Sequence, residues 1–378
     1  MDFSFTEEQT LLRNSVARFI EDNYDFDKRR AMIRSPQGRD PATWAQFAEL
    51  GLLAVPFTEE QGGLGGTPTD TMVILEEFGK GLVIDPYLPT VVLGGGFLRL
   101  GGSSSQQAEL IPHIVDGSLI LAFAYAERQA RYDLNDILCT AKKDGSGYVL
   151  NGQKGVVIAA PWADRLIVTA RTGGGQRDKG GISLFLVDAK AKGVSMRAYP
   201  TVDGQRAAEV SLENVSVPAD ARIGAEGEAF PLIETVVDHA LCALSAEAMG
   251  LHRRMLELTI EYTRTRKQFD QPLSKFQVLQ HRMADMYIHV EETVSTCYMA
   301  TIKLDAPETE RKAAAAAAKV QLGRAGKFIG QNAVQLHGGM GVTEEMSIGH
   351  YFKRATAMNA MFGDVDHHLR RFEALTQG

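Results

Sequence analysis

Residues 261–286 have the sequence EYTRTRKQFDQPLSKFQVLQHRMADM, and the rest of the chain is organised around this stretch. Its pattern predicts the end of one amphipathic helix, a break over residues 269–272, and the start of a second helix. Ser274 and Gln277 have the spacing of a capping box, so Ser274 is expected to be the N-cap of the second helix.

A basic run, Arg264, Arg266 and Lys267, comes directly before this break. It therefore lies at a helix C-terminus, where cations are favoured and the last carbonyl groups lack partners. By charge alone, such a run is more typical of a solvated helix end than of a binding site.

The composition limits the classes of protein to consider. A chain of 378 residues is too long for one ordinary core, so two or three sub-domains are expected. The hydrophobic fraction of 44% and the charged fraction of 23% are typical of a soluble globular protein. A net charge of −7 argues against nucleic acid or an anionic membrane as the main partner. Without a membrane-length apolar run or a recognisable targeting pattern, a cytoplasmic protein is expected.

The residues that most often bind metals give no metal-site pattern. Cys139, Cys242 and Cys297 are far apart and odd in number, so we expect reduced, mostly buried thiols. The doublet His367-His368 is expected to be a solvated helix feature, because adjacent positions place the two rings on different faces. No metal site is predicted.

The period of the apolar residues changes twice along the chain and predicts three domains. Residues 1–118 have helical spacing, and Thr6 and Gln9 form a capping-box pattern at the first helix. Residues 119–226 contain short β-branched runs separated by turn residues, which predicts a small antiparallel barrel or sandwich. Residues 227–378 return to long helices, one of them containing six consecutive alanines, and predict a helical bundle.

The sequence R-K-Q-F-D-Q-P-L, followed by F-Q-V-L-Q-H-R-M-A-D-M, closely resembles the signature of the acyl-CoA dehydrogenase family. The order of a helical domain, a β domain and a helical bundle is also that of the family, and the resemblance covers essentially the whole chain. It implies FAD as cofactor and an acyl-CoA thioester as substrate. It also implies that Arg266 contacts the FAD pyrophosphate and Phe269 its adenine end, usually for the flavin of a neighbouring subunit.

Residues 335–341, QLHGGMG, form a second motif. Glycines allow a backbone to approach a phosphate or a ring closely, although the spacing by itself favours a helix C-cap followed by a turn. The family has an equivalent Q-x-x-G-G-x-G motif at this point. The resemblance therefore implies that Gln335, Gly338 and Gly339 contact the FAD adenosine and pyrophosphate.

The positions that surround the flavin ring depart from the family pattern. Ala126 replaces a threonine that hydrogen-bonds the ring, and Val156 replaces a tryptophan that packs beside it. Ile158 replaces a second threonine, beside flavin N5. The adenine-end motifs persist while the ring-end motifs are lost. This contrast suggests a chain better suited to completing a neighbour's flavin site than to holding its own.

The catalytic base has two possible alignments. In most of the family a glutamate near the C-terminus removes the α-proton of the substrate. Alignment on Arg371 places Asp364 at that position, whereas alignment on Arg370 places Gly363 there and leaves no base. A second family position, on the first bundle helix, falls on Ala240 and is also vacant. Asp364 is therefore the candidate base, with a turn or helix N-cap residue as the alternative.

The combined expectation is FAD-dependent α,β-dehydrogenation of an acyl-CoA thioester. The sequence especially resembles the small-subunit branch of heteromeric enzymes acting on pimeloyl-CoA-type and sterol side-chain substrates. That resemblance implies a homo-oligomer or a hetero-oligomer with a second acyl-CoA dehydrogenase chain, and electron-transfer flavoprotein as acceptor. Two alternatives remain: a non-catalytic partner subunit that completes the FAD site of a paralogous chain, and a flavin oxidase of the same fold using an Asp base.

Overall fold

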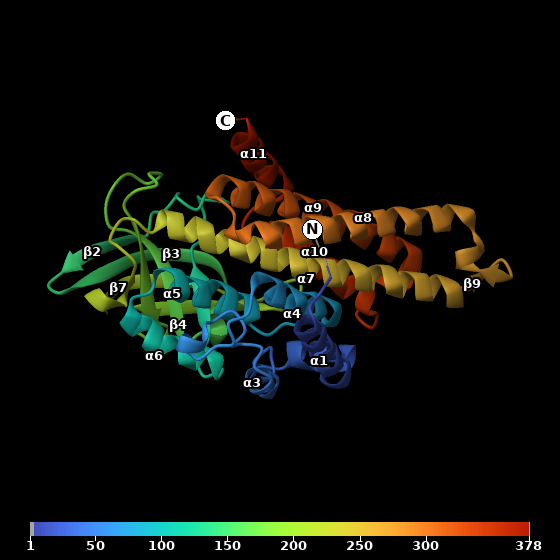
Figure 1. Ribbon diagram of the computed structural model, residues 1–378, viewed down its shortest axis with the longest axis horizontal. Coiled ribbons are helices and arrows are strands. Elements are labelled where there is room, and N and C mark those ends of the chain that lie inside the picture. The colour runs from blue at the N-terminus through green and yellow to red at the C-terminus, as the bar shows by residue number, and fades with distance from the viewer. Residues whose placement is uncertain (1–3, 378) are drawn as a thin grey trace. The chain divides into compact units, whose positions relative to one another are not determined.

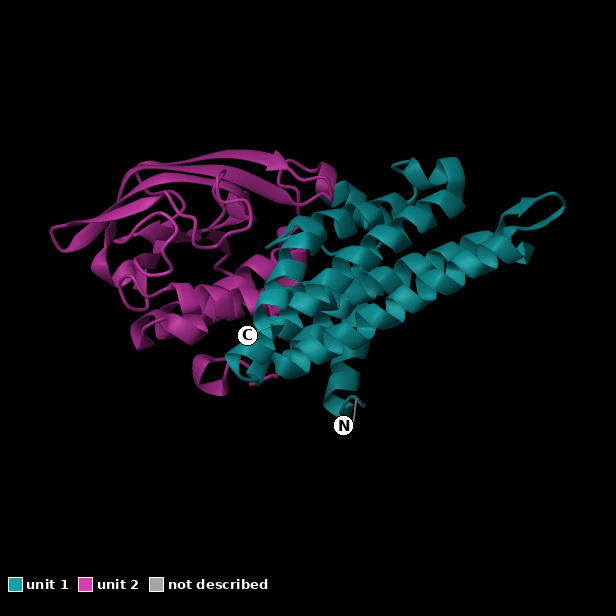
Figure 2. Cartoon of the chain, turned by 90° about the horizontal axis from the view of Figure 1, so that it is seen from above, with its two compact units in different colours: residues 1–32, 68–83, 241–378 teal, residues 33–67, 84–240 magenta. Residues whose placement is uncertain are grey.

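The computed structural model describes residues 4–377, and the chain divides into two compact units (Figure 2). One unit is made of residues 1–32, 68–83 and 241–378, and the other of residues 33–67 and 84–240. Each unit therefore combines segments that are far apart in the sequence. The long helix α7 (Phe230–Thr265) contains the boundary at residues 240 and 241.

The first unit is a helical bundle (Figure 1). Besides the second part of α7 and the start of α2 (Phe26–Arg34), its helices are α1 (Glu7–Asn23), α4 (Pro68–Gly81), α8 (Gln277–Ile302), α9 (Glu308–His337), α10 (Ser347–Ala360) and α11 (Val365–Thr376). The predicted capping box at Thr6 is confirmed. The Thr6 hydroxyl accepts from Gln9 N–H at 3.2 Å, and Thr6 N–H donates to the Gln9 side chain at 3.1 Å.

Close packing in the bundle depends on two glycines at the crossing of α4 and α7. A Cβ atom on Gly79 would lie 1.9 Å from the Glu247 carbonyl oxygen, and one on Gly250 would lie 1.8 Å from that of Glu76. The two backbones are thus too close for any side chain at either position. The buried Glu76 carboxylate beside this crossing is paired with Arg13 at 2.7 Å and with Arg253.

The predicted break after α7 is a short β-hairpin, β9 (Lys267–Gln268) and β10 (Gln271–Pro272), with residues 269 and 270 at its tip. The expectation that Ser274 caps the next helix is wrong. Ser274 lies inside a 3-10 turn, Leu273–Lys275, and α8 begins at Gln277 with Phe276 as its N-cap residue. The sequence spacing did not reveal that this extra turn separates the hairpin from the helix.

The second unit contains the β domain. Its helices are α3 (Pro41–Glu49), a π-helical segment (Leu88–Gly94), α5 (Gly95–Gly101) and α6 (Ser104–Val115). Its sheet consists of β1 (Leu121–Ala124), β2 (Thr140–Asp144), β3 (Gly147–Ile158), β4 (Arg165–Arg171), β5 (Ile182–Asp188), β6 (Val194–Pro200), β7 (Arg206–Pro218) and β8 (Arg222–Ile223).

The strand order is β6-β7-β3-β2-β4-β5-β8, with β1 paired to β4. Most pairs are antiparallel, as expected, but β1 is parallel to β4 along its whole length. Two strands separate β1 from β4 in the sequence. Because no hairpin joins them, their relative direction is not restricted to antiparallel.

The burial pattern supports the core expected from the sequence. Cys139, Cys242 and Cys297 are buried free thiols, as predicted. Burial raises the pKa of Cys297 to about 12, so this thiol is protonated and unreactive at neutral pH. No helix within residues 4–377 has both the length and the apolar character needed to cross a membrane. Not every apolar side chain belongs to this core, because α8 carries exposed ones at Val278, Tyr287, Ile288, Met299 and Ile302.

Candidate functional site

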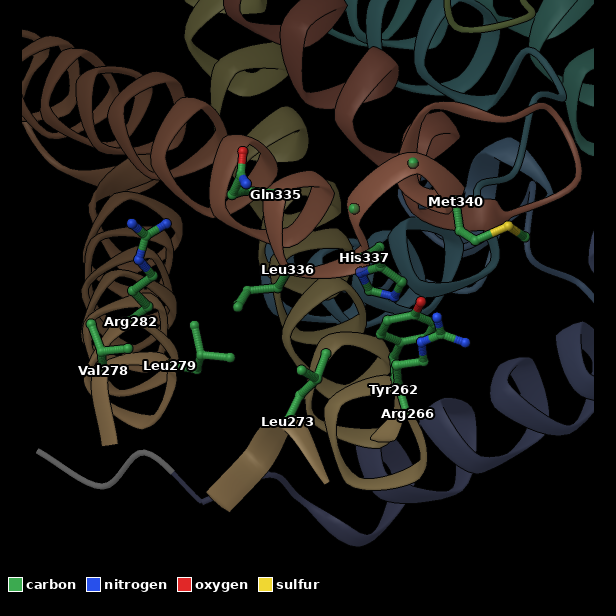
Figure 3. A pocket seen from close by; sticks show the side chains of 12 residues that line it. Tyr262, Arg266, Leu273, Val278, Leu279, Arg282, Gln335, Leu336, His337 and Met340 are labelled. Carbon is green, nitrogen blue, oxygen red and sulfur yellow. The ribbon is translucent and has the colours of Figure 1, made fainter. Parts of the chain in front are cut away.

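A cavity of about 720 Å³ lies within the helical bundle, between the end of α7, the first turns of α8 and the end of α9 (Figure 3). Its lining consists of Tyr262, Arg266, Leu273, Val278, Leu279, Arg282, Gln335, Leu336, His337, Gly338, Gly339 and Met340. Four of the predicted cofactor-binding residues, Arg266, Gln335, Gly338 and Gly339, are therefore brought together in one place. They come from segments about seventy residues apart in the sequence.

Two guanidinium groups line this cavity, Arg266 after the last turn of α7 and Arg282 on α8. The Arg266 backbone is fixed, because its N–H donates to the Tyr262 carbonyl at 2.8 Å and its carbonyl accepts from Leu273 N–H at 2.9 Å. Neither guanidinium forms a hydrogen bond or an ion pair with any residue in the part of the chain that the structure describes. Both charges are therefore available to an anionic ligand.

The end of α9 gives the cavity an open backbone. Gly338 has φ 59° and ψ −142°, a conformation that is essentially limited to glycine. A Cβ atom on Gly338 or Gly339 would meet nothing within 4 Å, so a ligand can approach both peptide groups directly. The preceding His337 ring stacks on Tyr262 at 4.3 Å between centroids. Burial lowers the pKa of His337, so this wall of the cavity is neutral and aromatic at physiological pH.

Phe269 lies at the tip of the β9–β10 hairpin and does not line the cavity of its own chain. Its side chain is 86% exposed, and its ring meets the edge of Phe276 at 6.2 Å between centroids. Phe269 and Asp270 have φ values of 53° and 64°, a turn geometry that normally requires Asn or Gly. An exposed aromatic ring on a strained backbone is unfavourable in an isolated chain, and such strain is often found at contact sites.

The three ring-end positions lie on the β domain. The Ala126 carbonyl accepts from Gly155 N–H at 2.8 Å, which joins the segment after β1 to β3. Val156 lies at an irregularity of β3 and has φ 49°, with its side chain 56% exposed. A β-branched residue in this region of backbone space is a genuine outlier. Ile158 ends β3 and is half-buried.

A buried ion pair supports this edge of the β domain. Glu127 accepts from Lys154 Nζ at 2.7 Å, and both side chains are almost completely buried. The remaining polar groups are satisfied, because Lys154 also donates to Thr169 Oγ1 at 2.8 Å and Glu127 accepts from Leu138 N–H at 2.7 Å. Burial opposes the charge on Glu127, but Lys154 outweighs it and lowers the pKa of that carboxyl.

Asp364 is the N-cap of α11, and its Oδ1 accepts from His367 N–H at 2.9 Å. The neighbouring histidines differ from the expectation of a solvated doublet. His368 is fully buried, and its ring contacts that of His367 at 5.1 Å between centroids. His368 is buried because α11 packs against α9, which turns one side of α11 inward. No cluster of three or more possible metal ligands is found among residues 4–377.

Comparison with known proteins gives the family of the chain. Family models for the acyl-CoA dehydrogenase N-terminal, middle and C-terminal domains match residues 6–118, 122–215 and 228–373. The chain belongs to the acyl-CoA dehydrogenase family. This membership confirms the expected fold of N-terminal helices, a β domain and a C-terminal helical domain, and FAD is the cofactor of the family.

Individual relatives of this acyl-CoA dehydrogenase span nearly its full length. The probable acyl-CoA dehydrogenase YngJ of Bacillus subtilis is 30% identical over 95% of both chains. CarC, a subunit of the caffeyl-CoA reductase–Etf complex of Acetobacterium woodii, is 30% identical over 82% of both chains. Among solved structures, the ChsE4–ChsE5 complex of Mycobacterium tuberculosis contains a chain with 29% identity and a TM-score of 0.89, covering 99% of this chain and 98% of that one.

The cavity has the chemistry that the adenosine and diphosphate end of FAD requires. The two guanidinium groups, which have no partner among the described residues, match two phosphate charges, and no described side chain covers the Gly338-Gly339 backbone. Sequence reasoning missed Arg282 and the Tyr262–His337 stack. No local motif marks them, because they reach the site only when α8 packs beside α7 and α9.

Proposed function

We propose that this chain catalyses FAD-dependent α,β-dehydrogenation of an acyl-CoA thioester as one subunit of an oligomer. The observation that carries the proposal is the convergence of Arg266, Gln335 and the Gly338-Gly339 turn on one cavity. Its two guanidinium groups have no partner in the part of the chain that the structure describes. Arg266 and Arg282 hold the diphosphate, and the glycine turn admits it to the backbone. Gln335 offers its amide to the adenosine.

The reaction removes a proton from the α-carbon of the thioester and a hydride from its β-carbon. FAD, when bound, would supply the acceptor for this hydride. Asp364 is the proposed base: its Oδ1 is held by His367 N–H, and its Oδ2 makes no hydrogen bond with the described residues and can accept the α-proton. An aspartate is one carbon shorter than the family glutamate, by about 1.5 Å. Its position on the backbone must therefore be well fixed.

Phe269 supports an oligomer in which neighbouring chains complete one another's sites. Its exposed ring and strained backbone are explained if the hairpin tip reaches the adenine end of a flavin in the next subunit. The exposed apolar residues of α8 provide a surface that a second chain can cover. Much of the subunit contact would then come from the bundle, residues 227–378, with residues 1–118 and 119–226 as the other two domains.

A second candidate is a non-catalytic partner subunit that completes the FAD site of a paralogous chain. The loss of the ring-end residues at Ala126, Val156 and Ile158 favours it, as does the similarity to a chain of the ChsE4–ChsE5 complex.

In either case the protein is proposed to act in the cytoplasm and to pass electrons to an electron-transfer flavoprotein. CarC, a subunit of a complex with such a protein by its name, supports that acceptor.

Flavin stoichiometry tests these proposals. The chain is purified alone and together with a candidate partner, a second acyl-CoA dehydrogenase chain from the same organism, and the visible spectrum and mass in solution are measured. One FAD per chain in a homo-oligomer that acyl-CoA bleaches supports the catalytic proposal. FAD only in the mixed complex, with Asp364→Asn fully active, establishes the partner role. Flavin reduction by a carbon acid without CoA, and not by acyl-CoA, would instead indicate an oxidase.

A further inference from the structure

The turn between α10 and α11, residues 361–363, holds Asp364 at the start of α11 and is confined to one conformation. Phe362 and Gly363 have φ values of 56° and 117°. A Cβ atom on Gly363 would lie 2.6 Å from the His367 ring and 2.7 Å from His368 Nε2, so only glycine fits there. The His368 ring also reaches back to the Phe362 carbonyl, with Nε2 2.9 Å from the oxygen.

The side chain of Lys319 fixes the other end of this turn. Lys319 is on α9 and is fully buried, and its Nζ donates to the carbonyls of Met358 at 2.9 Å and Asn359 at 2.8 Å. These carbonyls belong to the last turn of α10 and carry partial negative charge, and the Met358 carbonyl also accepts from Met361 N–H at 3.3 Å. Lysine thus caps α10 from a neighbouring helix.

The helices can approach closely here because α9 carries Gly323 at the contact. A Cβ atom on Gly323 would lie 2.3 Å from Asn359 Oδ1 and 2.5 Å from Val365 Cγ2, one on each side of the turn. Both α10 and α11 are therefore in direct contact with α9, one turn of helix after Lys319.

Among the residues that the structure describes, Asp364 is the acidic group whose charge acts on Lys319. Burial lowers the pKa of Lys319 to about 7, and Asp364 opposes this shift. Two other basic groups are near. Burial holds the pKa of His368 at about 3, so its ring is neutral at physiological pH, and the nearby charges of Lys319 and Arg371 lower this pKa further. Lys319 Nζ thus hydrogen-bonds to the α10 carbonyls, and the Asp364 carboxylate favours its charged form.

We propose that Lys319 is a positioning residue for Asp364. Its amine fixes the end of α10 through two hydrogen bonds to the Met358 and Asn359 carbonyls, so that the turn of residues 361–363 presents Asp364 in one position. This inference rests on the proposed role of Asp364 as base. Burying a lysine amine costs desolvation free energy, whereas water or a glycine turn can also satisfy the last carbonyls of a helix. The retention of Lys319 is explained when the position of the following residue matters.

The test compares Lys319→Met with Lys327→Met, an exposed lysine on the same helix, in the FAD-loaded oligomer. Hydrogen exchange of the amides of residues 358–368 is measured first. We expect exchange at least tenfold faster in Lys319→Met and unchanged in Lys327→Met. Flavin reduction at saturating thioester should fall about ten- to a hundredfold in Lys319→Met, because a displacement near 1 Å costs about that much. Flavin content and the half-saturating thioester concentration should stay within twofold.

Two results would overturn the proposal: unchanged exchange over residues 358–368, or a loss of flavin and thioester binding that parallels the loss of rate. If Lys319→Met does not fold, Lys319→Gln keeps a donor without the charge and should show the same pattern at smaller amplitude. Asp364→Asn separates the two proposals. Full activity of that variant would remove the base from the proposed function, while the exchange measurement would still decide whether Lys319 fixes the turn.

Discussion

Lys154 Nζ lies 2.7 Å from Glu127 Oε1, and both side chains are buried in the β domain. Removal of one partner leaves the other charge buried without compensation, so Lys154→Met should lower the free energy of unfolding by about 3–5 kcal/mol. Urea denaturation measures the change. The double variant Glu127→Gln/Lys154→Met should recover most of it. A loss below about 1 kcal/mol, the value of an exposed pair, would mean that water reaches this site.

Arg266→Lys should weaken FAD binding much more than it weakens folding, because an ammonium cannot contact two diphosphate oxygens with the geometry of a guanidinium. Loss of one charge-assisted bond corresponds to about 1.5–3 kcal/mol, or ten- to a hundredfold in affinity. Flavin titration of the apoprotein measures it. Arg264→Lys is the matched control, because Arg264 is in the same basic run but does not line the cavity. Equal effects of the two substitutions would contradict the site.

Phe269→Asn should separate stability from function. Asn adopts the left-handed conformation at position 269 more easily than Phe, so the chain should gain up to about 1 kcal/mol in unfolding free energy. FAD retention and the oligomer mass should both decrease, because the exposed ring is lost. Denaturation, flavin content and light scattering provide the three measurements. A monomer with full flavin would show that the hairpin tip serves no neighbouring subunit.

Buried His252 predicts an acid-dependent loss of stability. Burial lowers its pKa to about 3, so the folded state stays neutral while the unfolded state gains a proton below about pH 6.5. The unfolding free energy should therefore fall as pH decreases from about 6.5 to about 3, by about 1.4 kcal/mol per pH unit from this group. His252→Leu should remove that part of the slope in denaturation series, whereas His281→Leu, at an exposed position, should keep it.

Asp364→Asn should leave FAD and thioester binding intact, because the two side chains are nearly isosteric. It should abolish substrate-dependent flavin bleaching, because an amide cannot accept the α-proton at neutral pH. Stopped-flow single turnover measures the rate. Asp366→Asn, two positions further on α11 and exposed, is the control. Bleaching at the wild-type rate in Asp364→Asn would assign the base to another carboxylate or another chain.

The sequence by itself determined the family, the succession of helices, strands and helices, and the motif around Arg266, Gln335 and the two glycines. Local periodicity, turn residues and a dense motif are all present in consecutive residues, so these features can be recognised without a fold. The prediction that Ser274 caps α8 was wrong because it also rested on local spacing alone. Its spacing fits a capping box, but the backbone there forms a 3-10 turn instead.

Only the tertiary structure decided which side chains share a site and which ionisable groups are buried away from solvent. Arg282 reaches the cavity because α8 packs beside the ends of α7 and α9. His368 and Lys319 are buried because α11 and α10 close over α9. Burial and long-range pairing depend on residues far apart in the chain. Their effects on charge, hydrogen bonding and pKa arise only when the helices come together.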